Sequence, residues 1–335
     1  MKRTIALLLV LLMVFAVFAA CGSKTETKTE TKSETTEAKT ETAGADWPKQ
    51  PVNVVCPAAA GGGTDNALRL QNEYFVKKTG QSFVIDNITG IAGYEKTYQA
   101  NADGYNFICG TTTIFTSELD GTLTYDWDDY EMVGFASTPY NFNCVAVRAD
   151  SPYQTINDLL DAAKADPSSV TGGITMTGQP LMITSALQEV LGYELYLADV
   201  GNAGERNAAL LGGHVDWIMN NTSSCDPYVK SGDFRILAVC GDERYPMNPD
   251  VPTFKEMGID FSFPSQPMVW LAPKGTPKEV CEAFNKILRE INDDPNYQED
   301  VKNKLNSIVN DIPSVEESIK KAEEYKAALA PYVKK

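Results

Sequence analysis

A glycine-rich segment of this 335-residue chain has the composition of an anion-binding loop. Gly61, Gly62 and Gly63 are followed by Thr64 and Asp65, and they lie between a β-rich run and a helical pattern. Glycines let a backbone approach a ligand closely, and the free N–H groups at the start of a helix favour a negatively charged group. The segment therefore predicts a binding site for an anion.

Two other interpretations of this segment follow from its residue types. The glycines could serve only the turn, with Asp65 as the cap of the helix that follows. A nucleotide phosphate loop is excluded, because its Lys-Ser/Thr pair is absent and the chain continues Thr64-Asp65-Asn66.

Three further loops carry glycine, threonine or asparagine and follow strand-like runs or precede helical patterns: residues 110–113, 172–179 and 199–204. Each loop alone is weak evidence, since these residue types are common in loops. Together with the first loop they place two candidate loops in each half of the chain, as expected for a cleft between two similar domains. None of the four carries lysine or arginine, so we expect recognition through oriented N–H dipoles.

Catalysis has little support in the sequence. The only histidine, His214, lies in a predicted turn, so no Ser/His/Asp set can form. Paired carboxylates at Asp128-Asp129 and Asp293-Asp294 also lie in predicted turns. We expect no enzymatic activity, no catalytic residues and no cofactor.

Seven cysteines occur, at positions 21, 56, 109, 144, 225, 240 and 281, without the spacing of a metal site. Most of them lie in apolar, strand-like runs, where cysteine behaves as a small hydrophobic residue. We expect the six after Cys21 to be buried free thiols, and no metal site.

Short β-rich runs alternate with helical patterns along the chain. The predicted strands are 52–56, 83–86, 105–109, 144–147, 195–197, 215–219, 236–240 and 269–271. Thr276 with Glu279, and Ser314 with Glu317, have the spacing of capping boxes. Strands that alternate with helices predict an α/β fold of parallel sheets covered by helices on both faces.

The N-terminus has the pattern of an export signal. Lys2 and Arg3 precede an apolar run that ends in Phe18-Ala19-Ala20-Cys21. Residues 1–20 are therefore predicted to be a signal peptide, and they are similar to a bacterial lipoprotein signal in which Cys21 becomes the lipidated first residue. An ordinary signal peptide is the alternative.

Residues 22–46 contain no aromatic residue, Leu, Ile or Val. Such a segment buries too little apolar surface to fold, so 21–46 is predicted to be a lipidated cysteine with a disordered tether of roughly 25 to 30 Å average reach.

The rest of the chain, from residue 47 to 335, is near the length at which a single core divides into two domains. Loss of Lys2 and Arg3 with the signal changes the formal charge from −16 to −18. A surface this acidic is unsuited to nucleic acid and to anionic lipid headgroups.

Several segments in order carry a resemblance over essentially all of 47–335: residues 53–57 with 61–65, 102–105 with 110–112, 209–216, 249–253 and 271–277. They resemble the substrate-binding proteins of tripartite tricarboxylate transporters, the TctC or Bug family. The resemblance implies a two-domain, hinged periplasmic-binding-protein fold of a type II-like form, with the ligand cleft between the domains. Domain 1 would comprise 47–147 and 267–335, and domain 2 would comprise 148–266.

The resemblance also implies a function. The chain would be a monomeric receptor on the extracytoplasmic face of the cell membrane, held there by its lipid anchor. It would capture a small carboxylate and deliver it to a large and a small membrane subunit of the transporter. The alternatives are a binding protein for a sensor kinase or another transporter, and an enzyme on the same fold.

Candidate ligand-binding residues carried over by position are Ala60, Gly61, Gly62, Thr64, Asp65, Thr111, Thr112, Thr175, Thr177, Gly178, Gly201, Asn202, Ala203, Asn220 and Asn221. Two segments depart from the family. Residues 174–178 replace a common Ser-rich loop, and residues 200–204 replace a frequent Tyr-Lys-Gly-Gly segment. These departures argue against a citrate-like ligand and leave the fold intact.

Overall fold

The computed structural model describes residues 47–137 and 142–332, so the predicted signal, Cys21 and the tether lie outside the described residues. Ten strands form two five-stranded sheets. The first sheet consists of β1 (Val52–Cys56), β2 (Phe83–Asn87), β3 (Asn106–Gly110), β4 (Tyr130–Ala136) and β10 (Met268–Pro273). The second consists of β5 (Asn143–Arg148), β6 (Thr171–Ile174), β7 (Tyr196–Asp199), β8 (Trp217–Asn221) and β9 (Phe234–Val239).

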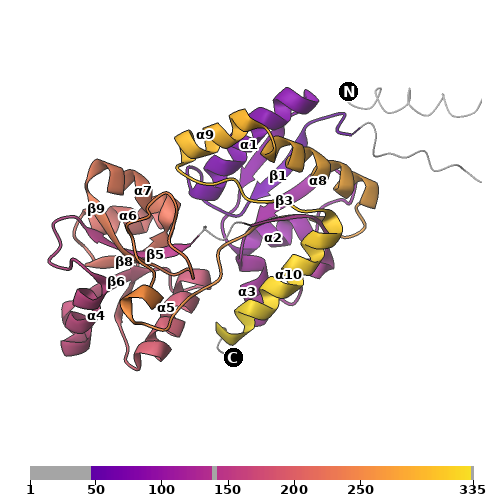
Figure 1. Ribbon diagram of the computed structural model, residues 1–335. Helices are drawn as coiled ribbons and strands as arrows, with labels where there is room; N and C mark the ends of the chain where they lie inside the picture. The colour runs from indigo at the N-terminus through magenta and orange to yellow at the C-terminus, as the bar shows by residue number, and fades with distance from the viewer. Residues whose placement is uncertain (1–46, 138–141, 333–335) are drawn as a thin grey trace, which may run out of the picture. The chain divides into compact units, whose positions relative to one another are not determined.

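Helices surround each sheet (Figure 1). Those around the first are α1 (Gly63–Thr79), α2 (Ile91–Tyr98), α3 (Thr113–Leu119), α8 (Lys278–Asn292), α9 (Pro295–Leu305) and α10 (Val315–Leu329). Those around the second are α4 (Ile156–Ala165), α5 (Gly178–Leu191), α6 (Ala203–Leu211) and α7 (Thr222–Ser231). Short 3₁₀ turns are η2 (Trp127–Asp129), η3 (Pro167–Ser169), η4 (Lys255–Met257) and η5 (Ala330–Tyr332). The predicted α/β class and two-domain fold are confirmed.

The prediction of purely parallel sheets is wrong. The first sheet has the order β2-β1-β3-β10-β4, in which β1 pairs in parallel with β2 and β3, whereas β10 is antiparallel to β3 and β4. The second has the order β7-β6-β8-β5-β9, in which β5 is antiparallel to β8 and β9. In each sheet one antiparallel strand lies where the chain has crossed over from the other sheet.

The chain changes sheets twice. It leaves the first sheet at Ala136 and enters the second at Asn143, and it returns at Met268. The predicted domain boundary at 147/148 lies at the end of β5, and the predicted boundary at 266/267 lies just before β10. Both boundaries stay predictions.

Two strands were missing from the prediction, β4 and β6. Residues 172–174, which were predicted to belong to a loop, form most of β6. Gly172 lies there because the indole of Trp217 packs across it, and a Cβ at Gly172 would lie 2.2 Å from that ring. The glycine is therefore needed for close packing between neighbouring strands. From the sequence alone, a glycine needed for packing cannot be distinguished from a glycine needed for a turn.

The two predicted capping boxes have different outcomes. The Ser314 side chain accepts a hydrogen bond from the N–H of Glu317 at the start of α10, as expected. Thr276 does not cap α8, because its hydroxyl donates to the carbonyl of Pro273 at 2.8 Å and the helix begins only at Lys278. That hydroxyl instead stabilises the turn between β10 and the helix.

An aromatic cluster forms the core on one face of the first sheet. Phe284 of α8 contacts Trp270 and Phe107 on the strands, with ring centroids 5.1 and 4.7 Å apart. Trp47 covers this cluster at 5.1 Å from Phe284, and its indole N–H donates to the carbonyl of Gly104 at 2.9 Å. The opposite edge of the cluster rests on α1 through Phe75, so the helix that carries the glycine-rich loop is fixed by the core.

Candidate functional site

The loops that follow β1, β3, β6, β7 and β8 line one cavity of about 1420 Å³. Its wall includes residues 57–64, Thr111, 175–182, 202–204 and Asn221. Because parallel strands end at the same edge of a sheet, the loops from β1 and β3 meet, and so do those from β6, β7 and β8. Both sheets therefore contribute loops to the same cavity, as predicted.

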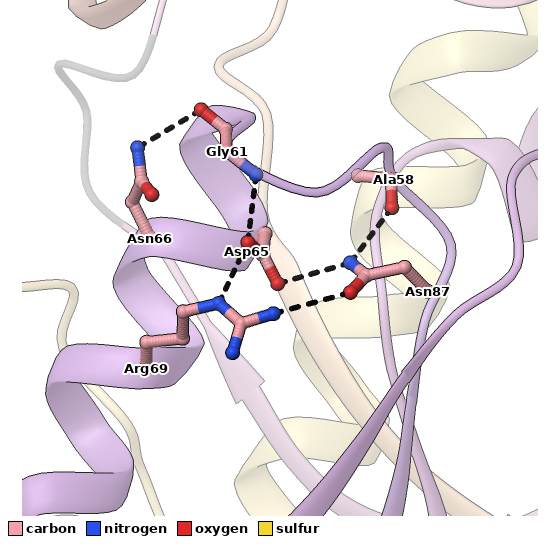
Figure 2. A network of polar contacts seen from close by, with 6 residues as sticks. All are labelled: Ala58, Gly61, Asp65, Asn66, Arg69 and Asn87. Carbon is pink, nitrogen blue, oxygen red and sulfur yellow. Dashed lines mark hydrogen bonds and ion pairs between the residues drawn. The ribbon is translucent and has the colours of Figure 1, made fainter.

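A network of polar contacts behind the glycine-rich loop fixes its shape (Figure 2). One carboxylate oxygen of Asp65 accepts hydrogen bonds from the N–H of Gly61 at 2.8 Å and from Nε of Arg69 at 2.9 Å. The other accepts from the side-chain amide of Asn87 at 2.9 Å, which also donates to the carbonyl of Ala58 at 3.0 Å. Both ends of the loop are thus tied to one buried carboxylate.

The network keeps Asp65 ionised. Burial alone would raise the pKa of Asp65, but the contacts with Arg69, Gly61 and Asn87 together lower it below its usual value. The Asp65 side chain is 1% exposed and lies outside the cavity wall. Asp65 therefore positions the loop, and the prediction that it contacts the ligand does not fit its place in the structure.

Five helices begin at the cavity without a side-chain cap. These are α1, α2, α3, α5 and α7, which follow Gly62, Gly90, Thr112, Thr177 and Asn221. In none of them does a side chain of the preceding residue accept a hydrogen bond from the first turn. Their first-turn N–H groups and helix dipoles favour a negative charge in the cavity.

The start of α6 differs, because its donors are already used. The Asn202 side chain accepts from the N–H groups of Gly204 and Glu205 at 3.0 and 3.2 Å. The Glu205 carboxylate in turn accepts from the N–H of Asn202 at 2.7 Å. This complete capping box leaves the fourth predicted loop less able to bind an anion through its backbone.

Most of the predicted site residues lie at the cavity. Those that line it are Ala60, Gly61, Gly62, Thr64, Thr111, Thr175, Thr177, Gly178, Asn202, Ala203 and Asn221. Those that do not are Asp65, Thr112, Gly201 and Asn220. Thr112, for example, is buried and its hydroxyl lies 2.8 Å from that of Tyr325 on α10. The four excluded residues support the loops from behind.

Two features of the wall were not among the predicted ligand-binding residues. Ser223 and Ser224 line the cavity in the first turn of α7. Like Thr111, they are hydroxyl residues that follow a predicted strand, so the same pattern could have identified them. The second feature is Arg206, which lies two residues beyond the fourth loop and also lines the cavity. Arg206 lies on the same face of α6 as the buried Leu210. Because arginines are seldom buried, its position on this face did not indicate that it lines a cavity.

The electrostatic character of the wall contrasts with that of the whole chain. Among the described residues that line the cavity, Asp120 alone is acidic, and it is exposed. Arg206 and Lys304 are the basic ones, and Lys304 is paired with Asp300 at 3.1 Å. A chain of formal charge −16 therefore keeps carboxylates away from this cavity.

The part of the chain that the structure describes has neither a metal-binding cluster nor a histidine at the cavity. No group of three or more His, Cys, Asp or Glu side chains there could hold a metal ion. His214 is exposed and does not line the cavity. The six described cysteines are buried free thiols, as predicted. Within the same residues, no helix has the length and apolar character needed to span a bilayer.

Two sheet-and-helix domains whose loops share one cavity define the class of periplasmic solute-binding proteins. The R. palustris protein solved with adipate has 25% sequence identity and a TM-score of 0.77, covering 86% of this chain and 98% of that one. The periplasmic binding protein BugD has 26% identity and a TM-score of 0.73, covering 85% and 97%.

The chain belongs to the family described as the tripartite tricarboxylate transporter family receptor, TctC, whose sequence profile matches residues 67–324. A relative from Cupriavidus necator, the UPF0065 protein in the gbd 5'region, is 31% identical over 261 residues, which are 76% of this chain and 78% of that protein. The family and the fold are those of extracytoplasmic solute-binding receptors, not of enzymes.

Proposed function

We propose that this protein is the lipid-anchored receptor of a tripartite tricarboxylate transporter and that it captures a small dicarboxylate in the cavity between its loops. The observation that carries the proposal is the cavity wall itself. Five helices without side-chain caps begin there, and a single exposed carboxylate is present among its described residues. Such a wall offers donors and a positive field to an anion and little repulsion against it.

The ligand contacts in this proposal are the predicted residues that line the cavity, together with Ser223 and Ser224. The relative solved with adipate supports a linear dicarboxylate as the first ligand to try. The departures at residues 174–178 and 200–204 argue in the same direction, away from a branched tricarboxylate.

Two glycines offer a matched test of the cavity. Gly61 and Gly80 flank α1, have φ of +79° and +73°, and would each carry a Cβ with nothing within 4 Å. Alanine at either position should therefore cost a similar amount of stability, roughly 1 kcal/mol, because both adopt the left-handed conformation. Only Gly61 lines the cavity.

Isothermal titration calorimetry with adipate should detect binding to the wild type and to Gly80→Ala, and weaker binding to Gly61→Ala. Equal affinities for both variants would contradict the placement of the site. Absence of binding by adipate and by shorter dicarboxylates would contradict the proposed ligand class.

Anchoring and delivery need separate tests. In this proposal Cys21 carries the lipid, so Cys21→Ser should release the mature chain from the membrane fraction. Delivery predicts that the ligand-loaded receptor co-purifies with two membrane subunits. Membrane retention of the Cys21→Ser protein would contradict the anchor.

A further inference from the structure

Arg206 on α6 is a buried cation at the wall of the cavity. Arg206 is 4% exposed and lines the cavity. Its guanidinium group contacts the loops after β6 and β7 and the strand β8. Nη1 donates to the hydroxyl of Thr175 and, at 2.6 Å, to the carbonyl of Gly201. Nη2 donates to the side-chain carbonyl of Asn220 at 3.1 Å. The guanidinium thus joins the carboxyl ends of β6, β7 and β8.

All of these acceptors are neutral. No acidic side chain of the described residues forms an ion pair with Arg206, and its Nε is buried without a hydrogen-bond partner. The neighbouring Glu205 carboxylate is committed to the N–H of Asn202 at the start of the same helix. By contrast, Arg69, Arg148 and Arg244 each pair with a carboxylate although each is far more exposed than Arg206.

An uncompensated buried charge is costly to the folded protein. Burial lowers the pKa of Arg206 to about 10, so the guanidinium still carries its charge at neutral pH. Of the three acceptors, Thr175 lines the cavity, and its hydroxyl donates its own proton to the carbonyl of Gly201. The Thr175 hydroxyl therefore has no proton left to donate to a ligand, and the positive charge of Arg206 lies one hydrogen bond from it at the same wall.

We propose that Arg206 determines specificity for charge: it is the counter-charge for one anionic group of the ligand, which binds on the cavity side of the contact between Thr175 and Gly201. This inference rests on the proposed function, in which the cavity is the solute site. It replaces the expectation that backbone dipoles alone attract the ligand. The dipoles of the uncapped helices that begin at the cavity orient the anion, and Arg206 makes a neutral analogue of the same shape a poor ligand.

A purely structural role for Arg206 predicts a different result, because a brace would affect all ligands alike. The test compares adipate with adipamide, its neutral diamide, by calorimetry on the wild type, Arg206→Gln and Arg206→Lys. The wild type should prefer adipate, and Arg206→Gln should lose roughly tenfold or more in affinity for adipate while its affinity for adipamide changes little. Arg206→Lys should retain much of the preference, because it keeps the charge.

Arg244→Gln is the control, since Arg244 is 45% exposed, pairs with Glu256 and does not line the cavity. A parallel loss of affinity for both ligands in Arg206→Gln would overturn the inference and leave the proposed function standing. If Arg206→Gln does not fold, Arg206→Lys becomes the test variant. An unchanged preference of Arg206→Lys for adipate over adipamide supports the role of charge, and a lost preference overturns it.

Bromide tests the same inference without a dicarboxylate. Anomalous scattering from bromide-soaked crystals should place an ion on the cavity side of Thr175 in the wild type and not in the Arg206 variant. If adipate fails to bind but bromide is found there, the proposed ligand class is wrong and the role of Arg206 is retained. If adipate does not bind and the wild type shows no bromide at this wall, the inference is overturned.

Discussion

Replacement of Asp65 by asparagine tests whether this residue positions the glycine-rich loop or contacts the ligand. The change keeps the shape of the side chain and removes its charge. One carboxylate oxygen serves both Gly61 and Arg69, and the other serves the amide of Asn87. In Asp65→Asn one of these oxygens becomes an NH₂ group, which must face a donor.

The expected cost follows from these contacts. Loss of charge assistance on two hydrogen bonds, and one donor facing another donor in a buried position, should lower the free energy of unfolding by about 2 to 3 kcal/mol. Arg69→Ala is the matched control. Its guanidinium is 53% exposed, so the ion pair is screened by solvent and its loss should cost much less than the change at Asp65.

The assay is urea-induced unfolding followed by circular dichroism at several pH values. The pKa of Asp65 is lowered in the folded protein, so its contribution to stability is present above the unfolded pKa of about 4 and is lost as the pH falls through the folded pKa. The difference between wild type and Asp65→Asn should therefore shrink below about pH 4. An unchanged free energy of unfolding, together with complete loss of adipate binding, would show that Asp65 contacts the ligand and would refute the positioning role.

Three further predictions concern other buried groups. Burial raises the pKa of Asp226 to about 6 despite hydrogen bonds from Asn306 and Asn248. The free energy of unfolding should therefore fall by up to about 3 kcal/mol as the pH rises from about 4 to 6. In Asp226→Asn the urea midpoint should depend less on pH over this range. Gly172→Ala should lower the free energy of unfolding in urea by about 3 kcal/mol or more, because the new methyl group clashes with the indole of Trp217. Gly192→Ala, at a φ of +74° with open space around it, should lower it by about 1 kcal/mol. Equal losses would contradict the packing argument. The six buried thiols should not react with an aromatic disulfide reagent at pH 8 until the protein unfolds, and fast labelling of the native protein would contradict their burial.

The fold could be predicted where the local pattern is strong. Apolar runs such as 52–56 and 269–271 correspond to buried strands, and Ser314 caps its helix as its spacing indicates. β6 was missed because two of its four residues are glycines, and only the neighbouring Trp217 explains why. The antiparallel strands were missed because strand direction depends on where the chain returns to a sheet, which no short pattern encodes.

The candidate site, like the fold, could be predicted where local composition decides, and not where residues distant in the sequence meet. Loop composition identified most of the cavity wall, since glycine, threonine and asparagine are needed there for close backbone approach. It did not separate residues that face the cavity from those that support it, such as Asp65 and Asn220. Arg206 was not among the predicted ligand-binding residues, because its burial depends on two loops and a strand that are distant in the sequence but meet in the fold.

The place of β10 in the first sheet has a consequence for how the chain folds as it is made and exported. In the described sheet β4 pairs with β10 alone, and β10 also borders β3, yet β10 follows the whole of the second sheet in sequence. Residues 130–136 therefore remain without a strand partner until residue 273 has emerged. The second domain, whose strands are contiguous in the chain, can form first, while the first domain stays incomplete and exposes apolar strand edges. The first domain therefore cannot close into a stable unit before nearly the whole chain has been synthesised.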